Sequence, residues 1–234
     1  MSAGSPTVAE NVGRVLDRIA AAERRAGRAG GSVKLVAASK SQPLSLILEA
    51  HAAGIAVFGE NYVQEAEEKI PGLPGAEWHM IGKLQGNKVR KAVSLFSWIQ
   101  TADSAKRLEE ISRCAAQEGR VVPVLLEVNL EEEESKAGIP PASLRRVAED
   151  SLGLPGLKVS GLMAIPPYGI DPEESRPYFV RLRELRDALA REFPAADLRE
   201  LSMGMSGDFE AAIEEGATMV RVGTAIFGGR HGRG

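Results

Sequence analysis

The sequence contains little of what marks several common classes of protein. Its single cysteine, Cys114, excludes an intramolecular disulfide framework and a metal site built from several cysteines. A formal net charge of −3 offers no basic surface for duplex DNA or for an anionic membrane. No apolar run approaches the roughly 20 residues of a membrane-spanning helix, and the N-terminal segment has no signal-peptide core. We therefore expect a soluble, cytoplasmic protein that binds neither nucleic acid nor membranes.

Familiar catalytic and metal-binding motifs are also missing. The three histidines are too widely spaced to ligate one metal ion, so no metal site is expected. The chain has no nucleophile elbow, no Walker loop and no dinucleotide-binding fingerprint. Cys114 falls in the middle of a predicted helix, where packing explains it better than a role as nucleophile. The function therefore has to be sought in less familiar patterns.

What the chain does contain is a regular alternation of short apolar runs and longer amphipathic ones. With 234 residues and 44% apolar residues, it is long enough for one large core and suits a single α/β barrel. The pattern predicts strands at residues 34–39, 55–58, 77–81, 95–100, 121–128, 159–164, 198–201 and 219–222. It predicts helices at residues 7–27, 44–53, 60–69, 85–93, 104–117, 143–151, 172–192 and 209–215.

Strands and helices that alternate in this way pair in parallel and connect by right-handed crossovers. Eight such units suggest a closed (β/α)8 barrel, or TIM barrel, and an open doubly wound sheet is the alternative. Only about a dozen residues follow the last strand, too few for an eighth outer helix, so the helix at 7–27 could fill that gap. We expect one domain over residues 1–234, with a solvated acidic run at 131–134 and a disordered tail at 229–234.

Lys40 directly follows the first predicted strand, in the segment KLVAASK. In a barrel, functional residues lie at the C-terminal ends of the strands. Partial desolvation of an amine at that mouth would favour its neutral form, which can form a Schiff base. The alternative is an ordinary surface lysine at the end of a strand.

Two small turns near the C-terminus suggest a phosphate site. Ser202, Gly204 and Ser206 form a hydroxyl-rich turn after the seventh strand, and Gly223 and Thr224 form a second turn after the eighth. Small residues let backbone N–H groups approach an anion, and hydroxyls add donors. The loops after strands 7 and 8 are the recurrent phosphate site of this fold. The alternative is that the glycines only make tight turns.

Several further polar positions admit two interpretations. Arg221 lies on the last strand, where it could pair with a carboxylate or face the ring nitrogen of a cofactor. Asn61 could lie at the barrel mouth or cap the next helix, and His79 could be functional or a hydrogen-bonded core residue. Glu60 and Glu65 are expected at a helix N-terminus or on its exposed face.

Five segments make the chain resemble, almost end to end, the YggS/PROSC family of pyridoxal 5′-phosphate (PLP) homeostasis proteins. They read LVAASKSQP, FGENYVQE, WHMIGKLQGNK, GLMAIPPYG and LSMGMSGDFEAAIEEGATMVRVGTAIFG, and the last is long and highly specific. The resemblance implies a single (β/α)8 barrel similar to the N-terminal domain of bacterial alanine racemase.

The resemblance also implies a set of PLP-binding residues. Lys40 would form the internal aldimine, a Schiff base with PLP, and Arg221 would face the pyridine nitrogen. Asn61 would lie near the ring. The phosphate would be bound by Ser206, Gly223 and Thr224, with the backbone of Met203 and Gly204.

An arginine opposite the pyridine nitrogen favours a carrier over an enzyme. A guanidinium cannot accept a proton, so it leaves the ring nitrogen unprotonated and the ring a poor electron sink. We therefore expect a non-catalytic, monomeric protein that buffers PLP and delivers it to apo-enzymes, and so affects amino- and keto-acid metabolism.

A PLP-dependent amino-acid racemase is the runner-up. Racemases of the related fold add a C-terminal β-domain, for which 234 residues leave little room. The nearest candidate bases, Tyr62 and Tyr168, have no spacing argument behind them. A third alternative is a phosphate-binding barrel aldolase that uses Lys40 without PLP.

Overall fold

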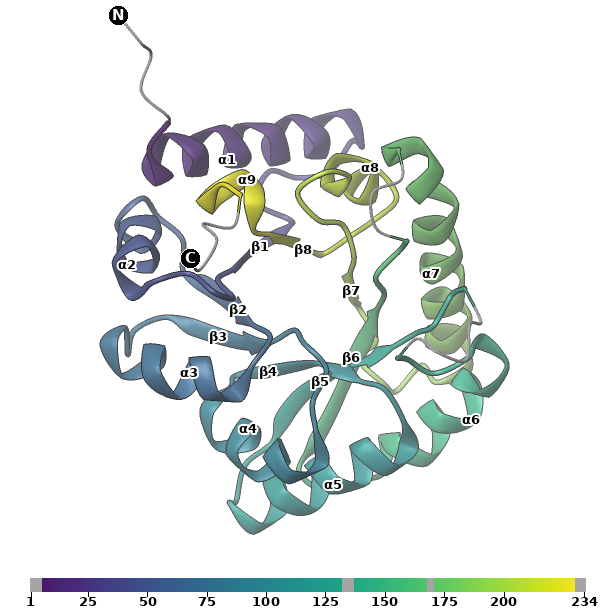
Figure 1. Ribbon diagram of the computed structural model, residues 1–234. Coiled ribbons are helices and arrows are strands. Elements are labelled where there is room, and N and C mark those ends of the chain that lie inside the picture. Colours follow the sequence, from purple (N-terminus) through teal and green to yellow (C-terminus); the bar gives the residue numbers. More distant parts are fainter. Residues whose placement is uncertain (1–5, 132–136, 168–170, 230–234) are drawn as a thin grey trace, which may run out of the picture.

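The computed structural model describes residues 6–131, 137–167 and 171–229, which form a closed barrel of eight parallel strands (Figure 1). Neighbouring strands pair in sequence order, and β1 pairs with β8 through Lys34↔Met219 and the residues that follow, which closes the ring. The strands are β1 Lys34–Ala38, β2 Val57–Glu60, β3 Glu77–Met80, β4 Trp98–Ala102, β5 Val122–Glu127, β6 Leu157–Met163, β7 Glu200–Ser202 and β8 Met219–Val222. The predicted closed (β/α)8 barrel is confirmed, and the open sheet is wrong.

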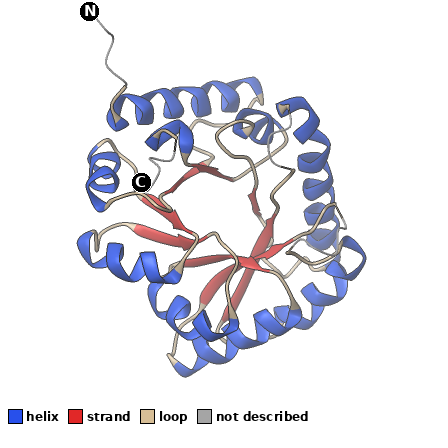
Figure 2. Ribbon diagram, in the orientation of Figure 1, coloured by secondary structure: helices blue, strands red, loops and turns tan. Residues whose placement is uncertain are grey.

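Helices surround the strands as an outer ring (Figure 2). They are α1 Val8–Arg25, α2 Leu44–Ala52, α3 Val63–Lys69, α4 Val89–Leu95, α5 Ala105–Gln117, α6 Pro141–Leu152, α7 Pro172–Glu192, α8 Phe209–Glu214 and α9 Thr224–Phe227, with 3-10 turns η1 Ile70–Gly72 and η2 Gly86–Lys88. Most predicted elements agree with these bounds to within a few residues. No helix among the described residues is both long and apolar enough to cross a membrane.

The helix that follows the last strand is short, and α1 takes its place in the outer ring. The four-residue α9 covers little of the barrel, whereas α1 packs against α2, α8 and α9 (Figure 1). Ion pairs from Arg18 to Glu210, 2.6 Å, and from Arg25 to Glu214, 2.7 Å, join α1 to α8. The expectation that the N-terminal helix fills this gap is confirmed.

The boundary between β2 and α3 differs from the prediction, and this changes the position of Glu60. The strand expected at 55–58 runs from Val57 to Glu60, and the helix expected from residue 60 begins at Val63. Glu60 is therefore a fully buried strand residue, and its expected place at a helix N-terminus or on an exposed face is wrong. Its carboxylate accepts hydrogen bonds from buried partners, which lets a charged residue continue the strand.

Three expectations lie partly or wholly outside the described residues. These are the disordered tail, apart from Gly229, the acidic run after Glu131, and Tyr168.

Candidate functional site

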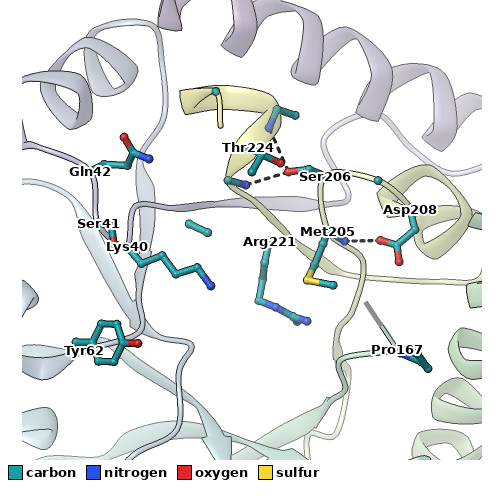
Figure 3. Close-up of a pocket in the computed structure, with 15 residues that line it drawn as sticks. Lys40, Ser41, Gln42, Tyr62, Pro167, Met205, Ser206, Asp208, Arg221 and Thr224 are labelled. Carbon is teal, nitrogen blue, oxygen red and sulfur yellow. Dashed lines mark hydrogen bonds between the residues drawn. The ribbon is translucent and has the colours of Figure 1, made fainter. Parts of the chain in front are cut away.

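A cavity of about 620 Å³ opens between the loops that follow β1, β7 and β8 (Figure 3). Five of the predicted site residues line it: Lys40, Ser206, Arg221, Gly223 and Thr224. They come from opposite ends of the chain, and they meet because β1 is the neighbour of β8 in the closed sheet. The described lining also includes residues that the sequence did not single out as binding, among them Gln42, Met205, Pro167 and Asp208.

Lys40 directs its side chain into this cavity, toward the region between Tyr62 and Arg221 (Figure 3). The residue is exposed, and its side chain borders a cavity that is open to solvent. The partial desolvation of its amine stays a prediction. A primary amine that water and small molecules can reach remains suited to react with a carbonyl group.

Across the cavity, two backbone N–H groups converge on one hydroxyl. Gly223 N and Ala225 N each donate to Ser206 Oγ over 3.2 Å, which connects the turn after β7 to the turn after β8. Asp208 Oδ1 accepts from Met205 N over 2.6 Å and orders the turn that carries Ser206 (Figure 3). These N–H groups and the hydroxyls of Ser206 and Thr224 form a cluster of donors that suits an anion.

Gly204 determines the backbone conformation of that turn. Its φ is +91°, and a Cβ there would lie 2.6 Å from Ala212 Cβ and 3.0 Å from Phe209 Cα. Only glycine accommodates both the left-handed backbone and the close approach to α8.

Three predicted binding residues do not line the cavity. Met203 is fully buried in the core, Gly204 is buried under the turn, and Asn61 is half-buried against the loop after β3, where Gly82 packs on its backbone. The alternative role of Asn61 as a helix cap is wrong, because α3 begins after Tyr62 and has no side-chain cap. The contacts of these three residues with a cofactor stay predictions.

Arg221 lies at the bottom of the cavity and is 4% exposed. Its guanidinium donates to Ser202 Oγ over 2.6 Å and to the Ala164 carbonyl over 2.9 Å. Among the residues that the structure describes, no carboxylate forms an ion pair with it. Burial lowers the pKa of Arg221 to about 10, against the opposing effect of Glu127 and Asp208, so it stays a cation at neutral pH.

The partners of Arg221 belong to a chain of hydrogen bonds through the barrel interior, which we call the polar chain: Arg221, Ser202, Gln100, His79 and Glu77. Ser202 Oγ donates to Gln100 Oε1 over 2.6 Å, and Gln100 Nε2 donates to His79 Nδ1 over 2.7 Å. His79 Nε2 therefore carries the proton that it shares with Glu77 Oε1 over 2.6 Å. Each member of the polar chain thus donates a hydrogen bond to the next, from Arg221 at the cavity to Glu77 at the opposite end of the barrel.

The polar chain decides one interpretation that the sequence left open and corrects one expectation. His79 is fully buried and hydrogen-bonded, which is the core role, and burial lowers its pKa and keeps it neutral. The bond from His79, with help from Lys34, lowers the pKa of Glu77 to about 2. The placement of Ser202 in the turn after β7 is wrong, because it ends the strand and points into the interior.

Glu127, at the end of β5, is a titratable group that sequence reasoning missed. It is 8% exposed, and its Oε2 has no hydrogen-bond partner within the described part of the chain. Burial, with the negative charge of Asp103, raises the pKa of Glu127 to about 7. The one available signal is a carboxylate near the end of the apolar run VVPVLLEV.

Around one cavity, the structure therefore gathers an accessible amine, a cluster of N–H and hydroxyl donors, and a guanidinium that only donates. These groups suit a ligand that carries an aldehyde or ketone, an anionic group such as phosphate, and a polar acceptor between them.

Comparisons with known proteins show the family to which this chain is similar. The family described as "Alanine racemase, N-terminal domain" matches residues 12–231. The "Pyridoxal phosphate homeostasis protein" of Aquifex aeolicus is 49% identical over 223 residues, which cover 94% of this chain and 97% of that protein. The structure of PipY from Synechococcus elongatus with PLP bound has a TM-score of 0.82 and 41% identity, over 92% of this chain and 100% of that one.

An alanine racemase from Clostridium difficile has a TM-score of 0.72 at 13% identity, over 95% of this chain and 57% of that one. At that identity the similarity shows the shared fold alone.

Proposed function

Because the chain belongs to the family of pyridoxal phosphate homeostasis proteins, we propose that it binds PLP, buffers its concentration and delivers it to apo-enzymes. In this way it would affect amino- and keto-acid metabolism. The observation that carries the proposal is that Lys40, the donor turns and Arg221 share one cavity. The PLP-bound structure of PipY, a relative with 41% identity, supports it.

The residues of the cavity fit the groups of PLP one by one. When bound, PLP supplies an aldehyde that condenses with a primary amine and releases water. Within the described lining, Lys40 is the primary amine that can react in this way. Ser206, Thr224 and the N–H group of Gly223 would hold the phosphate, and Arg221 would face the ring nitrogen.

Three further residues complete the proposed site. We propose that Asn61 comes near the ring and that the backbone of Met203 and Gly204 contributes to the phosphate site. Met203 and Gly204 support this because they directly precede the turn that carries Ser206. The left-handed backbone of Gly204, which only glycine accommodates there, sets the conformation of that turn.

The surroundings of Arg221 favour storage over consumption of the cofactor. Ser202 and Ala164 hold the guanidinium in place, and it remains protonated at neutral pH. A cation that only donates keeps a nearby ring nitrogen unprotonated, which weakens the ring as an electron sink. We therefore propose a non-catalytic role.

The test is spectroscopic and chemical. Purified protein mixed with PLP should absorb visible light, and borohydride should fix the cofactor irreversibly to Lys40, as located by mass spectrometry. Lys40→Ala should lose the fixed cofactor, while Lys83→Ala, which alters an exposed lysine outside the cavity lining, should keep it. Cofactor fixed to another lysine in the wild type, or none at all, would contradict the proposal.

Amino-acid racemisation is the second candidate, because Tyr62 lines the same cavity as Lys40 and could exchange a proton there. Chiral chromatography of amino acids incubated with the PLP-loaded protein separates the two. A carrier leaves each enantiomer unchanged, whereas sustained interconversion would establish the racemase.

We also propose that the protein works as a monomer in the cytoplasm and that its partners are apo forms of PLP-dependent enzymes. The single cysteine, Cys114, is free and buried, which suits a reducing compartment. Light scattering should give a mass near 25.0 kDa, and twice that value would contradict the monomer.

A further inference from the structure

The two residues that flank Lys40 are both bound to α3. On one side, Lys69 Nζ donates to the carbonyl of Ser39 over 2.9 Å. On the other, the N–H of Ser41 donates to Glu65 Oε2 over 2.7 Å. Lys69 and Glu65 are themselves paired, with 2.7 Å between Nζ and Oε2. The backbone before and after Lys40 is thus anchored to a single ion pair on a neighbouring helix.

This ion pair is connected to the barrel wall through Glu60. Lys69 Nζ lies 2.8 Å from Glu60 Oε1, which also accepts from Ser39 Oγ over 2.7 Å. We call Glu60, Glu65 and Lys69 the ion triad. Burial restricts the geometry of the ion triad, because a charged group removed from water is stable only while its partners stay within hydrogen-bonding distance. The side chains of Glu60 and Lys69 are 0% and 10% exposed, and that of Glu65 is 26% exposed, so the part of the ion triad that meets the barrel wall is buried.

The backbone at Ser41 shows why the loop needs a support. Its φ is +60°, the one left-handed value at a non-glycine residue in the described chain. Residues with a Cβ adopt this conformation at a cost and keep it where surrounding contacts impose it. The bond from Ser41 N to Glu65 is such a contact, and Lys40 is the residue immediately before it.

We propose that Glu65 and Lys69 are positioning residues for Lys40: they fix the backbone on both sides of it, so that its amine enters the cavity at the place where an aldehyde is bound. The inference rests on the proposed function, which makes Lys40 the reacting amine. An exposed lysine has many rotamers, and a fixed stem reduces the number of orientations that the amine must search. Attack on a carbonyl needs a narrow approach geometry, so this restriction speeds the condensation.

The decisive comparison is between Glu65→Ala and Glu67→Ala. Both residues lie on α3, but Glu67 pairs with Lys91 over 2.8 Å at the surface and forms no bond to the Lys40 loop. In cofactor-free protein, hydrogen exchange followed by mass spectrometry should show faster exchange at the Ser41 amide in Glu65→Ala alone. With PLP added, the rate at which borohydride-stable cofactor accumulates on Lys40 should fall at least about tenfold in the same variant.

A cofactor analogue separates positioning from general damage. Pyridoxine 5′-phosphate carries an alcohol in place of the aldehyde, so its binding uses the phosphate site and the ring contacts without the amine. Its affinity should be the same in wild type, Glu65→Ala and Glu67→Ala. Glu65→Gln should recover most of the Lys40 reactivity, because its amide oxygen can still accept from Ser41 N. Lys69→Met, which removes the anchor of Ser39, should repeat the loss seen in Glu65→Ala.

The outcomes distinguish this inference from the proposed function. Equal trapping rates in Glu65→Ala and Glu67→Ala, with attachment to Lys40 intact in wild type, would overturn the positioning role alone. A parallel loss of pyridoxine 5′-phosphate binding in Glu65→Ala would overturn it too, since the damage would then reach the whole cavity. If PLP failed to attach to Lys40 in the wild type, the proposed function would fall and this inference with it.

Discussion

Arg221 is oriented by a hydroxyl and a carbonyl, and the hydroxyl is oriented in turn by Gln100 and His79. Each member of the polar chain has a partner on both sides, so an apolar substitution at any of them removes a hydrogen-bond partner from a buried neighbour. The polar chain ends at Glu77. Because the pKa of Glu77 is lowered to about 2, this final acceptor stays charged across the neutral range. This gives the guanidinium a fixed direction without an ion pair to any carboxylate in the described part of the chain.

Gln100→Leu should therefore lower stability strongly. The variant leaves Ser202 and His79 buried, each with one partner missing, and an unpaired buried polar group costs about 1–3 kcal/mol. We expect the free energy of unfolding in urea to fall by about 2–4 kcal/mol. Gln117→Leu, at an exposed residue that accepts from Arg90, is the matched control and should change it by less than about 0.5 kcal/mol. Equal effects of the two variants would contradict the importance of the polar chain.

Glu127 predicts a pH dependence of stability. Burial raises its pKa in the folded state to about 7, above the value of 4.5 expected for an unperturbed glutamate, so between these values the folded state binds the proton more tightly. The stabilisation from this proton is complete below pH 4.5 and is lost as the pH rises through about 7. The linked free energy is about 3 kcal/mol.

Glu127→Gln mimics the protonated carboxyl and should remove this loss. The free energy of unfolding of the variant, relative to wild type, should rise between pH 4.5 and pH 7.5 by an amount close to the linked free energy. Urea titrations across that range measure it, and parallel pH profiles for the two proteins would contradict the assignment.

At the scale of secondary-structure elements, α1 completes the outer ring where the chain supplies only the short α9 after β8. Its apolar face covers the barrel beside α8 and α9, and its buried residues include Val12, Val15 and Ile19. An eighth helix is thus supplied from the beginning of the sequence. We expect the stability of the whole barrel to depend on this contact.

Ile19→Ala should lower the free energy of unfolding by about 2–4 kcal/mol, because it removes buried methyl groups and leaves a cavity. Ile19 is 5% exposed, whereas Leu16, on the same helix, is 41% exposed. Leu16→Ala should change stability by less than about 0.5 kcal/mol. Denaturant unfolding followed by circular dichroism tests the pair, and an equally small effect of both variants would show that α1 is a peripheral addition.

At the scale of the whole molecule, barrel closure creates the candidate site. Lys40 follows the first strand and Thr224 follows the last, yet they line one cavity because β1 pairs with β8. A ligand that contacts both loops therefore bridges the two ends of the fold. It should stabilise the barrel as a unit.

PLP should accordingly raise the free energy of unfolding, by about 2.7 kcal/mol when its free concentration is 100 times the dissociation constant. Urea midpoints measured at increasing PLP concentration provide the test. Pyridoxal without its phosphate, at the same concentrations, is the control and should stabilise less, because it cannot use the turns that carry Ser206 and Gly223. A midpoint that does not depend on PLP would contradict binding to the folded state.

The sequence by itself determined the alternation of eight strands with helices, which favoured a closed barrel over an open sheet, and it singled out Lys40 and the small turns near the C-terminus. These features can be predicted from local signals in the sequence, which are apolar periodicity, the spacing of glycines and hydroxyls, and the long C-terminal motif. Their signals lie within a few residues of one another, so they can be identified without knowledge of the fold.

Only the tertiary structure decided which polar residues face inward and with what partner. Gln100 and Ser202 are separated by 102 positions, so no local pattern could pair them or direct Ser202 away from the turn. Glu60 is buried because Ser39 and Lys69 meet its carboxylate, and Glu127 has a raised pKa because barrel closure removes its water. The free energy of a buried charge depends on what surrounds it in space, and that is decided when the strands close.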